Sequence, residues 1–131
     1  MRFHRVSLVV VGVAALAAAV AGCGSDPQSK QPQEYACTGS SAPAQACCEY
    51  LRATWDACVR CGLALPSQCS AEVDRQVQLA SFGRGCEGAD SIRDEAVYFD
   101  QCLPAMDALS CADLRTGNAP ESCVDQIEYR L

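Results

Sequence analysis

The sequence predicts an all-α fold, a small disulfide-rich helical domain of four or five short helices. Ten of the 11 cysteines fall between Cys37 and Cys123, a density that is typical of a disulfide scaffold. The periodic apolar patterns in this region have helical spacing, and no alternating apolar and polar run is long enough for a strand. Apart from cysteine and alanine, the 109 residues after Gly22 contain only 23 apolar side chains. A core this thin needs cross-links that restrict the unfolded chain.

The first helix is expected to follow Ser41 and Pro43 and to stop at Gly62. Its inner face is marked by side chains at spacings of four, four and three residues: Cys47, Leu51, Trp55 and Cys58. The other face carries charged residues: Glu49, Arg52, Asp56 and Arg60. Asp56 and Arg60 stand in the order that favours an i, i+4 ion pair.

Two more helices are expected in the middle of the domain. Ser70 can cap the first of them, which ends before Gly83. Its apolar residues are Val73, Val77 and Ala80. Ser91 and Asp94 resemble a capping box that opens the next helix. One side of that helix carries the apolar residues Ile92, Ala96, Phe99 and Leu103, and Tyr98 is expected to be more exposed than Phe99.

The last part of the chain is expected to be helical with one loop. Pro104 breaks or restarts the preceding helix, and a short helix is expected over residues 105–114. Residues 116–120 form a loop by composition. A final turn or two of helix is expected within residues 121–130.

The N-terminus predicts export and a lipid anchor. Arg2 and Arg5 precede residues 8–21, an uncharged run that suits a secretory signal and is short of the roughly 20 residues of a membrane-spanning helix. The run ends in Val20-Ala21-Gly22-Cys23, which resembles a bacterial lipobox. The resemblance implies a lipoprotein signal peptide over residues 1–22 and, on Cys23, a diacylglyceryl thioether and an amide-linked acyl chain such as palmitate. Several chains anchor a protein firmly where one would not.

Ordinary secretion is the alternative, with cleavage after an Ala-x-Ala-like site and Cys23 as just another cysteine. Gly24 and Ser25 follow Cys23, so the Asp that would retain a lipoprotein in the inner membrane is absent. In a Gram-negative host this favours the outer membrane. Residues 23–36 are polar, contain two prolines and are expected to form a lipidated, flexible tether that spans roughly 20 Å. Residues 37–131 are expected to form the cysteine-rich helical domain.

Without the expected signal peptide, the composition of the remaining chain excludes several classes of function. The remaining chain has eight cations and sixteen acids, a net charge of −8, which argues against nucleic acid as a partner. It also loses His4, the only histidine. A Ser-His-Asp or Cys-His arrangement and a histidine-ligated metal are therefore excluded. We expect no enzyme, no cofactor and no metal site.

Cys58-Val-Arg-Cys61 is a CxxC motif, which suggests either a thioredoxin-like redox pair or half of a zinc site with Cys69 and Cys86. A redox pair needs its first cysteine at a helix N-terminus, where the helix dipole lowers the thiol pKa. Here the motif lies at the C-terminal end of the first expected helix. Thiolate metal sites suit a reducing compartment, whereas export favours disulfides. We therefore expect separate structural disulfides, with a thiol-disulfide redox protein that uses Cys58 and Cys61 as the alternative.

All ten cysteines of the domain are disulfide candidates: Cys37, Cys47, Cys48, Cys58, Cys61, Cys69, Cys86, Cys102, Cys111 and Cys123. The adjacent Cys47 and Cys48 cannot easily bridge each other, so we expect them to tie one helix to two neighbours. The full connectivity stays open. The one pairing that we predict is Cys111 with Cys123, which bracket the loop at residues 116–120.

Two other groups of side chains have structural explanations. Asp90, Asp94 and Glu95 form the densest acidic cluster, but no EF-hand pattern is present and acidic residues are common in a first helical turn. Trp55 and Tyr50 could stack on a ligand, although their helical spacing is more typical of a core.

The order of features from Cys47 to Cys123 is similar to a recurrent cysteine-rich domain of secreted proteins and lipoproteins in myxobacteria and their relatives. The residues that carry the similarity are Cys48-x9-Cys58, Cys69, Gly85-Cys86, Gln101-Cys102, Ser110-Cys-Ala-Asp-Leu114 and Pro120-Glu-Ser-Cys123. The resemblance implies an extracytoplasmic, helical, disulfide-rich module without an established activity. This chain departs from the pattern by its extra cysteines, Cys37, Cys47 and Cys61. We expect a lipid-anchored, non-catalytic binding or structural module with an envelope protein or a glycan as its partner.

Overall fold

The computed structural model describes residues 34–130. The predicted signal peptide over residues 1–22, the lipobox with Cys23 and most of the expected tether lie outside the described residues. Within the described range, no helix is both long enough and apolar enough to cross a membrane.

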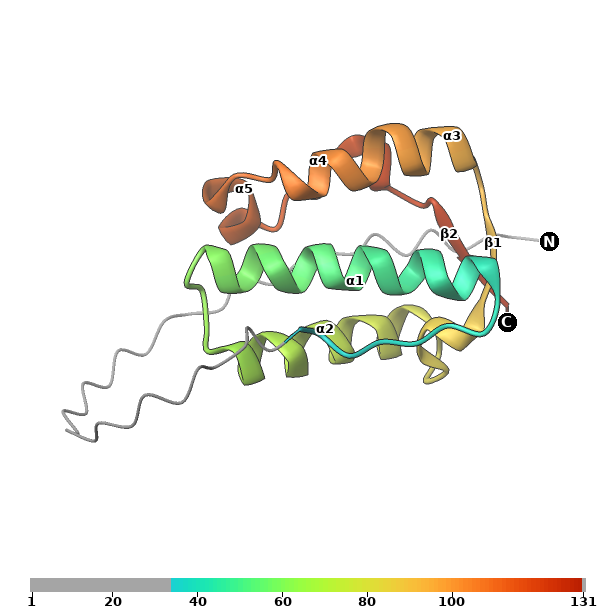
Figure 1. Ribbon diagram of the computed structural model, residues 1–131, viewed down its shortest axis with the longest axis horizontal. Coiled ribbons are helices and arrows are strands. Elements are labelled where there is room, and N and C mark those ends of the chain that lie inside the picture. Colours follow the sequence, from blue (N-terminus) through green and yellow to red (C-terminus); the bar gives the residue numbers. More distant parts are fainter. Residues whose placement is uncertain (1–33, 131) are drawn as a thin grey trace, which may run out of the picture.

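The long helix α1 (Ala42–Arg60) lies at the centre of the fold (Figure 1). Helix α2 (Pro66–Ala80) packs antiparallel on one side of it. A second helical stretch packs on its other side and contains α3 (Glu95–Val97), η2 (Tyr98–Cys102) and α4 (Leu103–Asp107). The remaining elements are η1 (Gly85–Gly88), β1 (Ala89–Ile92), α5 (Cys111–Thr116), η3 (Glu121–Cys123) and β2 (Ile127–Tyr129). The domain is thus mostly helical and disulfide-rich, as expected, but it is not purely α.

Helix α1 follows the sequence prediction closely at both ends. The Ser41 side chain caps its N-terminus by accepting a hydrogen bond from the Ala44 amide at 3.2 Å. The helix ends at Arg60, and Gly62 supplies the left-handed φ of 58° that turns the chain away. The predicted face packs against α2. A second face, which the sequence analysis missed, packs against η2 and α4 and consists of small or half-buried residues: Ala46, Tyr50 and Ala53.

Helix α2 begins at Pro66, so the prediction that Ser70 caps it is wrong. Proline is favoured in the first helical turn because its missing N–H would have no helical partner there. The Gln68 side chain accepts a hydrogen bond from the Leu65 amide at 3.0 Å and supplies the cap. The Ser70 hydroxyl instead lies inside the helix and donates to the Pro66 carbonyl.

A two-stranded antiparallel sheet corrects the expectation of an all-α chain. β1 pairs with β2 in the register Ala89 with Tyr129 and Ile92 with Ile127. The predicted capping box is wrong because Ser91 lies in β1, where its hydroxyl donates to Glu128 across the sheet. The helix therefore begins only at Glu95. Within residues 121–130, where a turn or two of helix was expected, η3 is a single helical turn and Ile127–Tyr129 form β2.

The turn at η2 is a π-helical turn, in which the Leu103 amide donates to the Tyr98 carbonyl five residues back. Pro104 follows directly and has no N–H to donate. Tyr98 lies on the same face as Cys102 and Met106, and this face packs against Ala46 of α1. Tyr98 is 0% exposed and Phe99 is 44% exposed, the reverse of the prediction.

Beyond Pro104 the chain forms two short helices in place of the single one expected over residues 105–114. Helix α4 ends at Asp107, and α5 starts after Ser110, whose hydroxyl accepts a hydrogen bond from the Asp113 amide at 3.1 Å. Gly117 ends α5 with a φ of 74°. The single-turn η3 follows the loop.

The core consists of two clusters on opposite sides of α1. The cluster toward α2 contains Leu51, Trp55, Val73 and Val77 together with buried cysteines. The cluster toward α4 is built from residues four apart in sequence, Tyr98, Cys102 and Met106, which pack against Ala46. Tyr35 belongs to the first cluster, so packing begins two residues before the expected domain boundary at Cys37.

Candidate functional site

The ten candidate cysteines form five disulfides among themselves. The bridges are Cys37–Cys48, Cys47–Cys86, Cys58–Cys69, Cys61–Cys111 and Cys102–Cys123. Four of the five involve α1 or Cys61, the residue that follows its last turn. Disulfides therefore tie the segment before α1, η1, α2 and α5 to α1 or its end, whereas the stretch from α3 to α4 is bridged to η3.

Cys47 and Cys48 tie α1 to two different neighbours, as predicted. Cys47 is bridged to Cys86 in η1, and Cys48 is bridged to Cys37 in the segment that precedes α1. The predicted pair of Cys111 with Cys123 is wrong. Cys111 lies instead beside the end of α1 and bridges to Cys61, with a Cα–Cα distance of 5.4 Å.

The two cysteines of the CxxC motif belong to different disulfides. Cys58 is bridged to Cys69 in α2, and Cys61 is bridged to Cys111 in α5. Both lie at the C-terminal end of α1, where the helix dipole raises a thiol pKa rather than lowering it. This geometry matches two structural cross-links and does not match a redox pair.

The sulfur atoms that do lie close together differ from the zinc set considered from the sequence. The Sγ atoms of Cys37, Cys48 and Cys86 lie within 4.8 Å of one another because two disulfides pack side by side. Cys58 lies three helical turns away from Cys47 along α1, so it is not part of this group. Disulfide sulfurs are not thiolate ligands.

The two aspartates of the acidic cluster considered from the sequence form structural contacts. Asp94 caps α3 by accepting a hydrogen bond from the Val97 amide at 3.0 Å. Asp90 forms an ion pair with Arg130 next to the sheet. These contacts account for the two aspartates without a bound calcium ion.

Burial favours the neutral form of the hydroxyl groups of Tyr98 and Tyr129. Burial raises the pKa of Tyr98, whose hydroxyl donates to the Ala46 carbonyl. Burial also raises the pKa of Tyr129 to about 12, and its hydroxyl lies 3.6 Å from the Cys47 sulfur. A raised phenol pKa disfavours the tyrosinate, so these groups contribute packing and hydrogen bonds.

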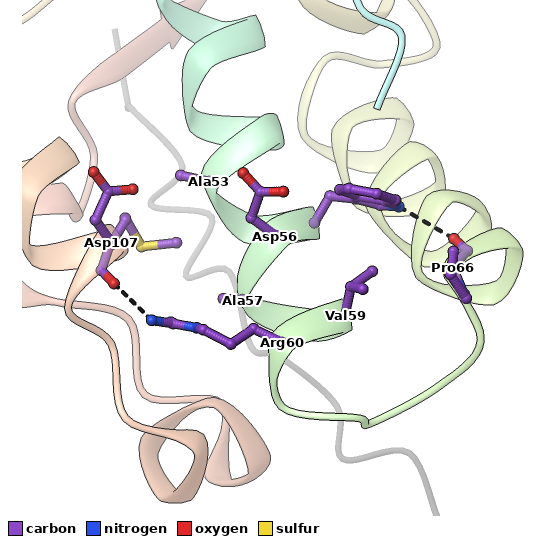
Figure 2. Close-up of a pocket in the computed structure, with 9 residues that line it drawn as sticks. Ala53, Asp56, Ala57, Val59, Arg60, Pro66 and Asp107 are labelled. Atoms are coloured by element: carbon purple, nitrogen blue, oxygen red, sulfur yellow. Dashed lines mark hydrogen bonds between the residues drawn. The ribbon is translucent and has the colours of Figure 1, made fainter. Parts of the chain in front are cut away.

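An open groove of about 420 Å³ crosses the C-terminal half of α1 (Figure 2). The residues that line it come from α1, α4 and the start of α2: Ala53, Trp55, Asp56, Ala57, Val59, Arg60, Pro66, Met106 and Asp107. Trp55 is 5% exposed, and its indole Nε1 donates to the Pro66 carbonyl at 3.1 Å. The ring is therefore part of the core and forms one wall of the groove, whereas Tyr50 does not line it.

The charged groups of the groove are not paired with one another. The predicted ion pair of Asp56 with Arg60 is not formed. The Arg60 guanidinium donates to the carbonyls of Asp107 and Leu109 at 2.9 and 3.1 Å and so caps the end of α4. Within residues 34–130, neither the Asp56 nor the Asp107 carboxylate forms an ion pair or a hydrogen bond with a side chain.

A second hollow of about 320 Å³ lies near the start of α1. Its lining is polar, and its carboxylates already have hydrogen-bond or ion-pair partners. The Ser40 amide and hydroxyl both donate to the Glu87 carboxylate, and Arg130 pairs with Asp90. Among the described residues, the groove on α1 therefore has more carboxylates without a partner than this hollow.

Sequence reasoning singled out Trp55, Asp56 and Arg60 but missed the rest of the groove. The signal that could have revealed its floor is Ala53 and Ala57, which lie one turn apart on the second buried face of α1. Met106 and Asp107 come from α4 and meet α1 only in the folded domain.

The comparisons with known proteins found no matching family model, no matching curated protein and no matching solved structure.

Proposed function

We propose that this protein is a lipid-anchored cell-envelope protein whose disulfide-stabilised helical domain is a non-catalytic binding or structural module. The observation that carries the proposal is the complete pairing of the ten cysteines from Cys37 to Cys123. Five disulfides persist in oxidising compartments, which favours a location outside the cytosol. In a Gram-negative host this location would be the outer membrane rather than the inner membrane.

The number of cysteines and their pairing support the lipid anchor. The chain has 11 cysteines, and the ten in the domain pair among themselves, so the disulfide framework does not require Cys23. Cys23 stands in the lipobox-like motif directly after the apolar run. Among residues 34–130 the first buried side chain is that of Tyr35, which stands 12 residues after Cys23; a flexible linker of this length would span roughly 20 Å between membrane and domain.

Two features support a role without catalysis. The chain after the signal peptide contains no histidine, which removes the commonest general base. Cys58 and Cys61, the strongest catalytic candidates by motif, lie in separate disulfides. The partners of such a module are the membrane, through the lipid, and an envelope protein or a glycan.

Metabolic labelling tests the anchor. We expect labelled palmitate to enter the full-length protein produced in a Gram-negative bacterium and not to enter the Cys23→Ala variant. The wild-type protein should also fractionate with membranes, and the variant should not.

Ser25→Ala is the matched control, because it changes a small residue two positions from Cys23 outside the lipobox-like motif. It should be labelled like the wild type. A signal-cleaved wild-type protein that carries no label, or equal labelling of wild type and Cys23→Ala, would overturn the lipid anchor.

A further inference from the structure

We propose that the groove on α1 binds a lysine-bearing peptide segment of a partner protein. The lysine methylenes would lie on the apolar floor, and the ammonium group would lie between the carboxylates of Asp56 and Asp107. This deepens the binding role proposed above and does not depend on the lipid anchor.

The floor of the groove suits an unbranched aliphatic stem. Ala53 and Ala57 lie one turn apart on α1, and their short side chains leave the hollow open. Met106 borders it from α4, and Trp55, whose indole donates to the Pro66 carbonyl of α2, borders it on the other side. Val59 lies toward α2 (Figure 2). A lysine stem can cover such an apolar surface while its charged end stays at the rim.

The rim of the groove suits a cation. Asp56 from α1 and Asp107 from α4 are exposed, and Figure 2 shows both carboxylates turned to the same side of the groove. Neither is neutralised by an ion pair within residues 34–130. Of the residues in 34–130 that line the groove, Arg60 is the one cation, and its guanidinium donates to two main-chain carbonyls. The lining thus carries two negative charges and one positive charge.

The shape of the donor group favours lysine over arginine. The carboxylates approach from two helices, and the three N–H groups of an ammonium can point in different directions. A planar guanidinium is better matched to one carboxylate, which it contacts with two parallel hydrogen bonds.

The partner is a different protein rather than a second copy of this domain. Residues 34–130 contain no lysine, and the single lysine of the chain is Lys30 in the expected tether. The net charge of −6 for the whole chain, or −8 without the signal peptide, disfavours self-association and attracts a basic partner.

Fluorescence anisotropy with a defined probe tests the proposal. The probe is a labelled peptide of sequence Gly-Leu-Lys-Ala-Leu-Lys-Gly, and its counterpart carries Glu in place of each Lys. The protein is the chain from residue 23 with Cys23→Ala and intact disulfides. We expect saturable binding of the lysine peptide, no binding of the glutamate peptide, and weaker binding as salt rises from about 0.02 to about 0.2 M.

The decisive comparison uses two charge-matched double variants. Asp56→Asn with Asp107→Asn should weaken binding of the lysine peptide by about tenfold or more. Glu95→Gln with Glu121→Gln removes the same charge from exposed residues outside the groove and should change the affinity by less than about twofold. Ala53→Leu fills the floor and should also weaken binding.

Three results would overturn the proposal. The first is equal loss of affinity in the two double variants, because the attraction would then depend on net charge alone. The second is unchanged affinity in Asp56→Asn with Asp107→Asn. The third is binding that appears only after Lys30→Gln, which would identify the tether as the occupant of the groove.

Discussion

Tyr98 is the largest side chain that the domain buries completely. Its ring fills the space between the helical stretch Glu95–Asp107 and α1, and its hydroxyl donates to the Ala46 carbonyl. Burial of a phenol without such a partner would cost free energy, so the hydrogen bond fixes both the position and the orientation of the ring. The neighbouring Phe99 packs edge-on against it at a centroid distance of 5.1 Å but remains on the surface.

The two aromatic residues should therefore differ sharply on truncation. We expect Tyr98→Ala to lower the free energy of unfolding by about 3–5 kcal/mol because it empties a buried site. Phe99→Ala should cost about 1 kcal/mol, since it loses mainly the edge contact with Tyr98. Urea denaturation of both variants under oxidising conditions measures the difference. Equal losses, or a larger loss for Phe99→Ala, would contradict the burial described here.

At the scale of elements, α1 organises the domain because it is buried on two sides. One side presents larger apolar residues and cysteines to α2, and the other presents alanines and Tyr50 to the helical stretch opposite. The disulfide Cys61–Cys111 holds α5 to the end of α1, and Arg60 donates to the Leu109 carbonyl close by. Few other contacts join α5 to α1.

Removal of that bridge should loosen α5 more than the rest of the fold. The bridge joins residues 50 apart, and both cysteines are half-buried, so Cys61→Ser with Cys111→Ser creates little cavity. Loop closure predicts a loss of about 4 kcal/mol in the free energy of unfolding.

Relative to the wild type, amide hydrogen exchange in the double variant should accelerate more in residues 111–116 than in α2. The wild-type protein, in which both elements are bridged to α1 or its cap, is the reference. Uniform acceleration across the domain, or no change in α5, would argue against this assignment of the bridge.

The elements that the sequence predicted best are those with local signals. Ser41 lies directly before α1, Pro43, Leu51 and Trp55 lie within it, and these local features predict the helix closely. The strands could not be predicted in this way, because β1 and β2 are short and form only by pairing with each other across more than 30 residues. The start predicted for the third helix was wrong, since Ser91, which resembles an N-cap in the local sequence, lies in β1 and its hydroxyl donates to Glu128 across the sheet.

At the scale of the whole molecule, the disulfides supply stability that a core with few large apolar side chains does not provide. Their number followed from the even count of ten cysteines, but their connectivity depends on which helices lie side by side. Cys111 and Cys123 bracket a loop in sequence, yet α5 brings Cys111 to Cys61, and η3 brings Cys123 to Cys102.

The groove depends on the same long-range arrangement. Sequence reasoning named Asp56 and Arg60 as an ion pair on an exposed face. In the folded domain the Arg60 guanidinium donates to the carbonyls of Asp107 and Leu109, and Asp56 and Asp107 line the same groove. The alanine floor was missed because alanine gives a weak periodic signal.

The most direct test is a thiol count and a disulfide map of the full-length protein produced in a Gram-negative bacterium. Free thiols are measured in denaturant without reductant, and the bridges are assigned by mass spectrometry of proteolytic fragments. We predict that none of the ten cysteines from Cys37 to Cys123 is free and that Cys58 and Cys61 are bridged to Cys69 and Cys111, respectively. A Cys58–Cys61 bridge, or a free and reactive Cys58, would contradict it and would indicate a thiol-disulfide redox protein.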